Sequence, residues 1–337
     1  MRAVIYDQPG SMHVGTAPDP VPGIGGVVVK VGVVGICGSD LNIAGGLFPP
    51  TPFPIIPGHE FSGEVVAVSP DVDFIKEGDR VAVDPSLFCG HCSWCRAGRG
   101  NLCDSWGAIG DTVNGAAAEY VAAPAANCHL IPDSMTFADA AVVEPLSCAV
   151  HAITMAPPRV GESVLVIGGG TMGLLTGQLL ARGGACVLAL VEQRAERLPI
   201  GTAVGFGPTF GDVSAALEDR PQGYDLVVDA TGVPAAIQAG FDAVAKGGRF
   251  LQVGVAPPDA PVNFSPFRIY NEEITVIGSM AVLNSYAPAL RLIADGTVNV
   301  GPLLTHNLPL AQYPEAFDVL RRGEGLKIQL SPGAATA

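Results

Sequence analysis

The segment VLVIGGGTMG, residues 164–173, decides the fold class of this chain. Its first four residues are apolar and mostly β-branched, which is typical of a buried strand, and a leucine-rich helical pattern follows. The glycines match the Gly-x-Gly-x-x-Gly pattern that holds a pyrophosphate between a strand and a helix. Gly168 permits the tight turn, Gly170 lets backbone N–H groups approach the phosphates, and Gly173 lets the helix pack closely on the sheet. An ordinary glycine-rich turn is the alternative.

A carboxylate at the end of the next predicted strand strengthens this interpretation. Glu192 follows residues 186–191, at a place where a carboxylate can accept both ribose hydroxyls and would repel a 2′-phosphate. This favours NAD, but Arg194 and Arg197 follow closely, and a guanidinium there could hold the phosphate of NADP instead. The other predicted cofactor contacts lie at the glycine turn or after a predicted strand: Thr171, Met172, Arg197, Thr231, Gly254, Val255 and Ser279.

The pattern of strands outward from this segment predicts two kinds of domain. Apolar strands alternate with helical or turn segments, which indicates a parallel sheet covered on both faces; they are expected at residues 163–167, 186–191, 224–228, 249–253 and 274–277. The residues before them predict an all-β domain with a proline-rich loop at residues 48–58 and strands at residues 27–35, 63–69 and 80–83. We predict a first domain over residues 1–146, a nucleotide-binding domain over residues 147–285, and a return to the first domain over residues 286–337.

Charge and composition limit the classes of partner. The 337 residues carry a formal charge of −14, which disfavours nucleic acid and anionic lipid and favours a small-molecule partner. The apolar stretch at residues 163–191 is long enough for a membrane span, but a glycine triplet, Gln178 and Arg182 interrupt it. The N-terminus has no signal-peptide core, so we expect a cytoplasmic protein whose eight cysteines are reduced and available to metals.

Four of the cysteines lie close together in the sequence. Within a lobe at residues 86–104, they follow the spacing Cys-x2-Cys-x2-Cys-x7-Cys: Cys89, Cys92, Cys95 and Cys103. Four thiolates can surround one zinc ion tetrahedrally and leave no open position, so this site is expected to be structural. An iron–sulfur cluster also takes four thiolates, but nothing else in the sequence indicates electron transfer.

A second set of possible metal ligands is scattered along the chain. Cys37 follows the first predicted strand, His59 and Glu60 follow the proline-rich loop, and Glu144 lies where the second domain begins. Three ligands of the cysteine, histidine and carboxylate types would leave the fourth zinc position open for substrate. Taken singly, a cysteine after a strand is more often a small core residue, and a His-Glu pair is more often a polar surface pair.

Five motifs together resemble the zinc-containing medium-chain dehydrogenases: GICGSDLN around Cys37, PGHEFSGEV around His59, the four-cysteine lobe, EPLSCAVHA around Glu144, and the glycine turn. The Glu-Pro-Leu at Glu144 is similar to the sorbitol and polyol branch, whereas typical alcohol dehydrogenases have a cysteine there. The resemblance implies a GroES-like β domain, a Rossmann domain and a dimer or homotetramer. It also implies one catalytic and one structural zinc per chain, and oxidation of a small polyol to a ketose with NAD.

The resemblance also implies roles for individual residues. Cys37, His59 and Glu144 would lie close to the catalytic zinc, and Glu60 would be a direct ligand or exchange with water. Asp40 would orient His59, and Ser39 would accept the proton of the substrate hydroxyl.

In two places the chain departs from the family. Asn42 stands where the family often has a histidine that continues the proton relay, so water would complete the route. Ala281 stands where animal sorbitol dehydrogenases have an arginine that binds the sugar chain, so the identity of the polyol stays open. A dehydrogenase for threonine or another amino alcohol, one for simple secondary alcohols, and a catalytically silent NAD-binding protein are the alternatives.

Overall fold

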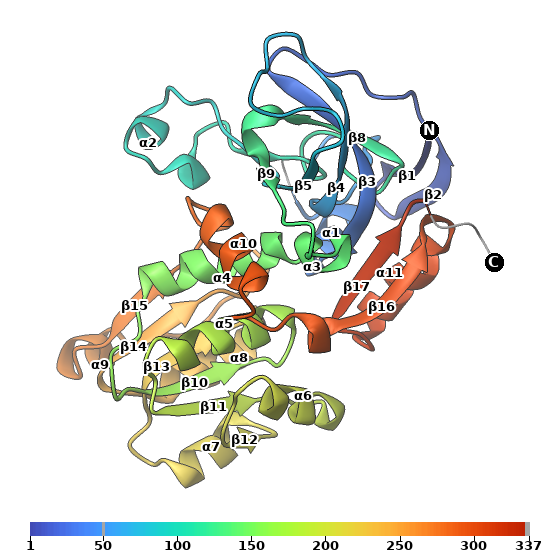
Figure 1. The fold of residues 1–337 in the computed structure, drawn as a ribbon. Coiled ribbons are helices and arrows are strands. Elements are labelled where there is room, and N and C mark those ends of the chain that lie inside the picture. Colours follow the sequence, from blue (N-terminus) through green and yellow to red (C-terminus); the bar gives the residue numbers. More distant parts are fainter. Residues whose placement is uncertain (49–50, 334–337) are drawn as a thin grey trace. The chain divides into compact units, whose positions relative to one another are not determined.

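The computed structural model describes residues 1–48 and 51–333, which form two compact units. Unit 1 comprises Met1–Glu144 and the segment from Val282 onward, and unit 2 comprises Pro145–Ala281 (Figure 1). The first segment of unit 1 ends two residues before the boundary predicted at position 146, and unit 2 ends four residues before the one predicted at position 285. Residues 49–50 of the predicted proline-rich loop and residues 334–337 of the predicted third segment lie outside the described residues.

Unit 2 is built on a parallel sheet of six strands in the order β12-β11-β10-β13-β14-β15. The strands are β10 (Ser163–Ile167), β11 (Val187–Val191), β12 (Thr209–Phe210), β13 (Tyr224–Asp229), β14 (Val244–Gln252) and β15 (Thr275–Gly278). The chain leaves β10 toward β11 on one side and later returns to β13 on the other, so the carboxyl ends of these three strands meet at a topological switch point. Such a point is where a parallel sheet binds its ligand.

Helices cover both faces of this sheet because side chains of a strand alternate between faces. α7 (Val213–Asp219) and α8 (Pro234–Asp242) pack in one core with Leu165 and Ile167. α5 (Thr171–Arg182) and α6 (Leu198–Ala203) lie on the opposite face, where Gly173 meets Val166 and Gly201 meets Leu190. α6 is short and has Pro199 in its first turn, where the missing backbone N–H of a proline is tolerated. The last helix of the unit is α9 (Pro266–Asn271).

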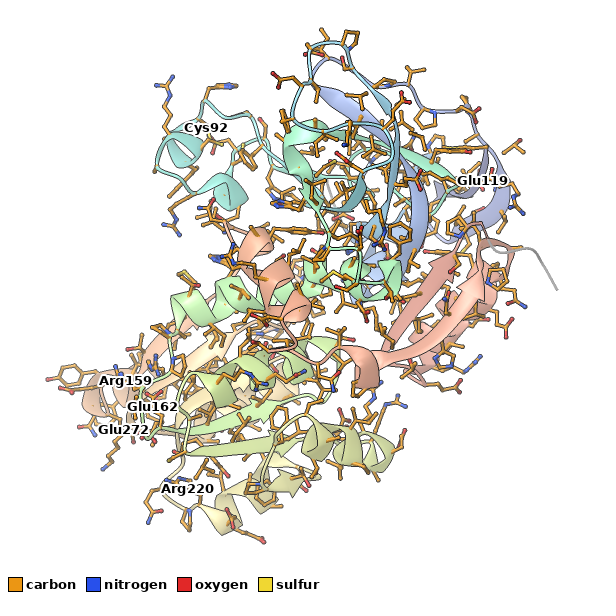
Figure 2. The ribbon with its side chains drawn as sticks, viewed as in Figure 1. Cys92, Glu119, Arg159, Glu162, Arg220 and Glu272 are labelled. Carbon is orange, nitrogen blue, oxygen red and sulfur yellow. The ribbon has the colours of Figure 1, made fainter. Side chains whose placement is uncertain are left out.

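A buried ion pair closes the amino end of the same sheet, opposite the switch point. Glu162 directly precedes β10, and its carboxylate lies 2.6 Å from the guanidinium of Arg249 on β14. Both side chains are only 7% exposed. Figure 2 shows Arg159 beside Glu162, and the backbone N–H of Arg159 donates to the Glu162 carboxylate at 2.7 Å. These contacts stabilise the sheet away from the ligand end.

Unit 1 contains a seven-stranded sheet formed by both ends of the chain. Its main path runs β16-β17-β3-β4-β5-β9, with β8 also pairing with β3. The strands are β3 (Gly26–Ile36), β4 (Glu60–Val68), β5 (Arg80–Val83), β8 (Tyr120–Pro124), β9 (Cys128–Leu130), β16 (Leu304–Pro309) and β17 (Lys327–Ser331). Two shorter sheets pair β1 (Arg2–Gln8) with β2 (Ser11–Thr16) and β6 (Ser86–Leu87) with β7 (Gly107–Ala108). β4 begins three residues earlier than predicted and therefore includes Glu60.

The α-helices of unit 1 are short, with ten residues or fewer. They are α1 (Gly38–Ala44), α2 (Ser93–Arg96), α3 (Phe137–Ala141), α10 (Tyr286–Ala294) and α11 (Tyr313–Arg322). The chain passes from unit 1 into unit 2 within the first turn of α4 (Val143–Met155). Across the described part of the chain, no helix combines the length and the apolar character that crossing a membrane requires. The predicted α/β fold class, a parallel sheet covered by helices on both faces together with a separate β-rich domain, is confirmed.

Candidate functional site

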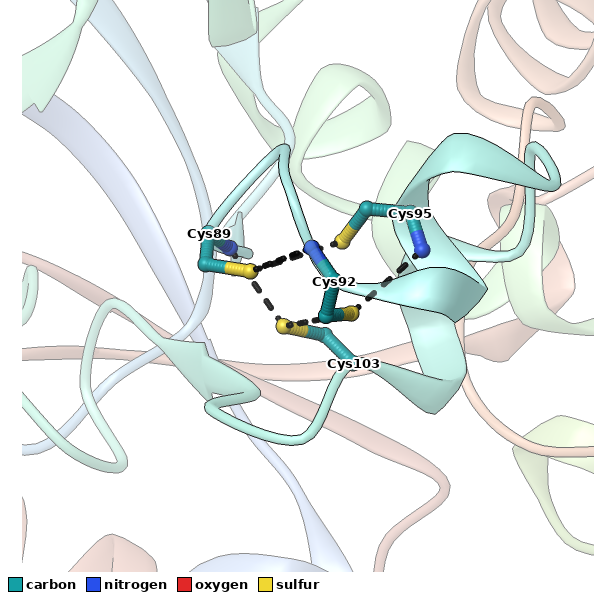
Figure 3. A group of neighbouring side chains, drawn as sticks. All are labelled: Cys89, Cys92, Cys95 and Cys103. Atoms are coloured by element: carbon teal, nitrogen blue, oxygen red, sulfur yellow. Dashed lines mark hydrogen bonds between the residues drawn. The ribbon is translucent and has the colours of Figure 1, made fainter.

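The four cysteines of the lobe converge on one point (Figure 3). Their ligand atoms all lie within 4.8 Å of one another, with Sγ atoms 4.0 Å apart for Cys89 and Cys95 and 3.9 Å apart for Cys92 and Cys103. A zinc ion with Zn–S bonds of about 2.3 Å holds tetrahedral sulfurs roughly 3.8 Å apart, so the observed separations fit one ion. A multi-iron cluster would hold some of its thiolates farther apart, because they bind different iron atoms.

Backbone N–H groups prepare these sulfurs to carry negative charge. The backbone N–H of Cys92 donates to the sulfur of Cys89, and that of Ser105 donates to the sulfur of Cys103; both N–Sγ distances are 3.3 Å. The backbone N–H of Cys95, which points at Cys92, contributes most to lowering the pKa of Cys92 to about 6. Burial raises the pKa of Cys95 to about 12, so a bound metal would have to deprotonate this thiol, and the closed set of four sulfurs fits a structural zinc.

Replacing Cys95 by serine is expected to remove one zinc per chain and to loosen the lobe. Three thiolates and a hydroxyl bind zinc more weakly than four thiolates, and the short α2 has little other support. Zinc content by elemental analysis and the rate of limited proteolysis within residues 89–103 check this result. An unchanged zinc content would contradict it. The exposed Cys186, replaced by serine in the same way, is the control.

A second cluster lies in unit 1, formed by Cys37, His59 and Glu60. Their ligand atoms also lie within 4.8 Å of one another. Cys37 directly follows β3 at the N-terminus of α1, whereas Glu60 is the first residue of β4, the neighbouring strand. Zinc bonds to nitrogen, oxygen and sulfur are about 2.0 to 2.3 Å long, so small side-chain rotations are enough for one ion to reach all three donors.

Glu60 is held by a lysine that the sequence did not point to. The Nζ atom of Lys327 on β17 lies 2.6 Å from each carboxylate oxygen of Glu60, and both side chains are almost fully buried. Gly35 on the intervening β3 leaves room for this contact, because a Cβ atom there would lie 2.2 Å from Glu60 Oε2. Burial alone would lower the pKa of Lys327, but the charge and hydrogen bond of Glu60 together with the neighbouring acidic groups outweigh it, and the pKa is raised.

The two nitrogens of His59 face different surroundings. Nε2 lies 3.3 Å from the hydroxyl oxygen of Ser39. Nδ1 lies 3.1 Å from Asp111 Oδ1 and 3.9 Å from Asp40 Oδ1. Asp40 was expected to orient this imidazole, but its Oδ2 accepts the backbone N–H of Cys37 at 2.8 Å, and Asp111 lies closer to Nδ1.

Buried carboxylates make this region short of positive charge. Burial would lower the pKa of His59, but Asp111 and Asp40 together with Cys37 outweigh it, and the pKa is raised well above its usual value. Burial raises the pKa of Asp40 to about 6 and that of Glu144 to about 7. A divalent cation would relieve this imbalance and displace the proton from His59, so the residues fit a zinc ion.

Glu144 is near this cluster but is not one of its three converging members. It is buried in the first turn of α4, and the charges of His59 and Glu60 both act on its carboxyl group. The structure thus brings together Cys37, His59 and Glu60, with the hydroxyl of Ser39 beside them, and leaves Glu144 outside the 4.8 Å set.

A cavity of about 540 Å³ opens in unit 2 at the switch point of the sheet. Five predicted cofactor contacts line it: Gly168, Gly170, Glu192, Arg197 and Thr231. Asp212 and Ser214 also line it and were not predicted, since they follow the very short β12. The cavity has the position and the glycine turn that a dinucleotide needs.

Glu192 is anchored at the edge of this cavity. Its Oε2 accepts the N–H of Gly169 at 2.8 Å, and its Oε1 accepts the N–H of Arg194 at 2.7 Å. The guanidinium of Arg197 lies 3.8 Å from the same carboxylate. Glu192 therefore carries a fixed negative charge where the adenosine ribose of a dinucleotide would lie.

The other predicted cofactor contacts are not among the cavity lining: Thr171, Met172, Gly173, Gly254, Val255 and Ser279. Gly173 has a packing role instead, since a Cβ atom there would lie 1.8 Å from the carbonyl oxygen of Gly168. Gly254 is similarly confined, because a Cβ atom would lie 2.1 Å from the nitrogen of Gly232. Asp229 organises this edge by accepting the N–H groups of Thr231 and Gly232.

Comparison with protein families gives two matches along the chain. Residues 23–133 match the alcohol dehydrogenase GroES-like domain, and residues 171–295 match the zinc-binding dehydrogenase domain. The first match lies in unit 1, and the second covers most of unit 2 and continues into the return segment.

Similar proteins match over almost their whole length. D-arabinitol dehydrogenase 1 of Uromyces fabae is 34% identical over 98% of this chain and 97% of its own, and the sorbitol dehydrogenase of Halalkalibacterium halodurans is 33% identical over 98% and 99%. The L-threonine 3-dehydrogenase of Escherichia fergusonii is 30% identical over 93% and 94%. Among solved structures, a zinc-binding dehydrogenase of Sinorhizobium meliloti bound to NADP has a TM-score of 0.93 and 32% identity, covering 98% of this chain and 99% of that one.

Proposed function

Because the chain belongs to the zinc-dependent medium-chain dehydrogenases, in their polyol dehydrogenase-like group, we propose that it oxidises a secondary hydroxyl of a small sugar alcohol to the ketone with NAD. The observation that carries this proposal is the cluster of Cys37, His59 and Glu60 with a serine hydroxyl beside it. Two polyol dehydrogenases that match over nearly the full chain support the substrate class.

The proposed catalytic zinc would be held by Cys37, by His59 through Nε2, and by a carboxylate. Glu60 and Glu144 are the two carboxylates available, and Glu60 must share its oxygens with Lys327. A zinc ion bound there would act as a Lewis acid, which lowers the pKa of a bound hydroxyl as it lowers that of water from 15.7 to about 7. A second zinc in the cysteine lobe would support the fold only.

The chain itself would guide the proton of the substrate. Ser39 is half-buried and lies beside the imidazole of His59, so it can accept the hydroxyl proton and pass it toward solvent. Asn42, further along α1, cannot take up a proton at neutral pH, so water would complete the path. NAD would supply the acceptor for the hydride, and the glycine turn of unit 2 would bind its pyrophosphate.

NAD is proposed over NADP because of the fixed charge on Glu192. A 2′-phosphate would approach a carboxylate that already accepts two backbone N–H groups and cannot turn away without losing them. Because the similar structure from Sinorhizobium meliloti is bound to NADP, the cofactor preference of this chain needs a direct test.

Replacing Glu192 by glutamine is expected to shift cofactor preference toward NADP by roughly tenfold or more. The amide oxygen can still accept one backbone N–H group, but the amide no longer repels a 2′-phosphate. Removing about 1.4 kcal/mol of repulsion corresponds to a tenfold change in preference. The ratio of kcat/KM for NAD to that for NADP, measured with one alcohol, checks it. If the ratio stays the same, Glu192 does not set the preference.

A substrate panel tests the proposed activity. Reduction of NAD should be fastest with unphosphorylated sugar alcohols of four to six carbons, such as arabinitol and sorbitol, and slower with threonine, butane-2,3-diol and propan-2-ol. Faster turnover of threonine would favour the alternative function, an amino-alcohol dehydrogenase. The similarity to the L-threonine 3-dehydrogenase of Escherichia fergusonii is the reason to test it. No turnover of any alcohol with either cofactor would overturn the proposal.

A further inference from the structure

We propose that Asp111 is a positioning residue for the catalytic zinc: it accepts the Nδ1–H of His59 and so keeps Nε2 of that imidazole directed at the metal site. This inference rests on the proposed zinc site. It assigns to Asp111 the role that the sequence suggested for Asp40, and the geometry of the loop carrying Asp111 supports it.

The contact itself is short and buried. Nδ1 of His59 lies 3.1 Å from Asp111 Oδ1, and the two side chains are 8% and 9% exposed. Among the described residues neither atom has an aligned hydrogen-bond partner, so each is left for the other: the distance is that of a hydrogen bond, and a rotation of the imidazole would direct the N–H at the carboxylate. Asp40 lies farther from Nδ1, at 3.9 Å, and its Oδ2 already accepts the N–H of Cys37.

The backbone fixes Asp111 at this place. Gly110, directly before it, has a φ of +91° and touches Gly58, the residue directly before His59. A Cβ atom on Gly110 would lie 2.6 Å from the carbonyl carbon of Gly58, and one on Gly115 would lie 2.5 Å from its oxygen. Both loops can approach this closely only because these positions are glycines.

Hydrogen bonds between the same two loops prevent them from sliding. The N–H of Gly115 donates to the carbonyl of Ile56 at 2.7 Å, and the N–H of Ala116 donates to that of Gly58 at 2.9 Å. The side-chain oxygen of Asn114 accepts the N–H of Ile56 at 3.0 Å. The position of Asp111 relative to His59 is therefore set by main-chain contacts on both sides of the pair.

An oriented histidine binds zinc better because the ring need not be ordered when the metal arrives. A carboxylate that accepts the second ring N–H also makes the ligating nitrogen more basic, and losing such a partner typically weakens metal affinity by about 10- to 100-fold. A neutral amide could still accept the hydrogen bond but would stabilise the zinc-bound imidazole less. Alanine would remove both effects.

The test compares holoenzymes of the wild type, Asp111→Asn and Asp111→Ala, with Asp73→Asn as a control that removes an exposed carboxylate in the same unit. Zinc affinity is measured by competition with a chromogenic chelator, and the ligand field is read from the visible spectrum after cobalt substitution. We expect the affinity of the more easily released zinc to fall about 10- to 100-fold in Asp111→Ala and by less in Asp111→Asn, with an altered cobalt spectrum and no change in the control.

Other results separate the possible failures. An unchanged zinc affinity and cobalt spectrum in both Asp111 variants would overturn the inference while leaving the zinc site intact. A wild-type protein that binds zinc in the cysteine lobe alone would instead overturn the proposed function. If Asp111→Ala does not fold, the smaller change in Asp111→Asn decides, because that side chain keeps the size and the hydrogen-bonding oxygen of aspartate.

Discussion

Replacing Cys37 by alanine is expected to abolish alcohol oxidation while leaving dinucleotide binding intact. The thiolate is the soft donor of the proposed catalytic site, and the cluster loses its convergence without it. Loss of Lewis-acid stabilisation worth several kcal/mol corresponds to a fall in kcat/KM of about a thousandfold or more. All residues that line the cavity proposed to bind the dinucleotide belong to unit 2, so the affinity of the protein for the dinucleotide should not change.

Two measurements check this expectation, namely steady-state oxidation of the best polyol and NADH binding by fluorescence titration. Zinc content should fall by one ion per chain, since the cysteine lobe keeps its four thiols. Cys128→Ala is the matched control, because this cysteine is also half-buried in unit 1 but belongs to neither cluster. Loss of activity together with loss of NADH binding would point to misfolding and count against the assigned role.

Replacing Lys327 by methionine is expected to destabilise the zinc-free protein by about 3 to 5 kcal/mol. Methionine fills a similar volume, but it leaves the carboxylate of Glu60 buried without the cation that lies 2.6 Å from both of its oxygens. Breaking a buried ion pair by removing one partner has a cost of this size. The free energy of unfolding from urea titration, followed in the presence of a chelator, measures it.

The double variant Lys327→Met with Glu60→Gln provides the control for this experiment. Removing both charges should restore much of the lost stability, so the two changes together should cost less than their sum. A loss below about 1 kcal/mol in the single variant would show that Glu60 finds another partner or becomes protonated. Addition of zinc should reduce the deficit if Glu60 can also ligate the metal.

The fold class could be predicted because its signals are local. The strand, glycine turn and helix around residues 163–182 lie in one short segment, and β5 and β10 have the bounds that their apolar runs predicted. Two errors in the predicted strand bounds, at β4 and β14, lie where a strand contains glycines. β14 begins at Val244 instead of residue 249, because Gly247 and Gly248 lie inside it at an irregularity in the pairing.

How much of the site could be predicted depended on how far apart its residues lie in the sequence. The cysteine lobe is contained in fifteen residues and could be predicted from spacing. Lys327 is 267 residues from Glu60, and a single lysine on a strand carries no sign of the carboxylate it will meet. Asp111 lies in a turn rich in glycine and polar residues, where an aspartate ordinarily needs no functional explanation.

The sheet of unit 1 also dictates an order of events during synthesis. Unit 2 is one continuous segment and can fold as soon as it leaves the ribosome. Glu60, by contrast, is translated long before β17, the strand that brings the ammonium group of Lys327. The nascent first unit must therefore wait, with β3 as the open edge of its unfinished sheet and the Glu60 carboxylate still without its cation, until β17 has been translated.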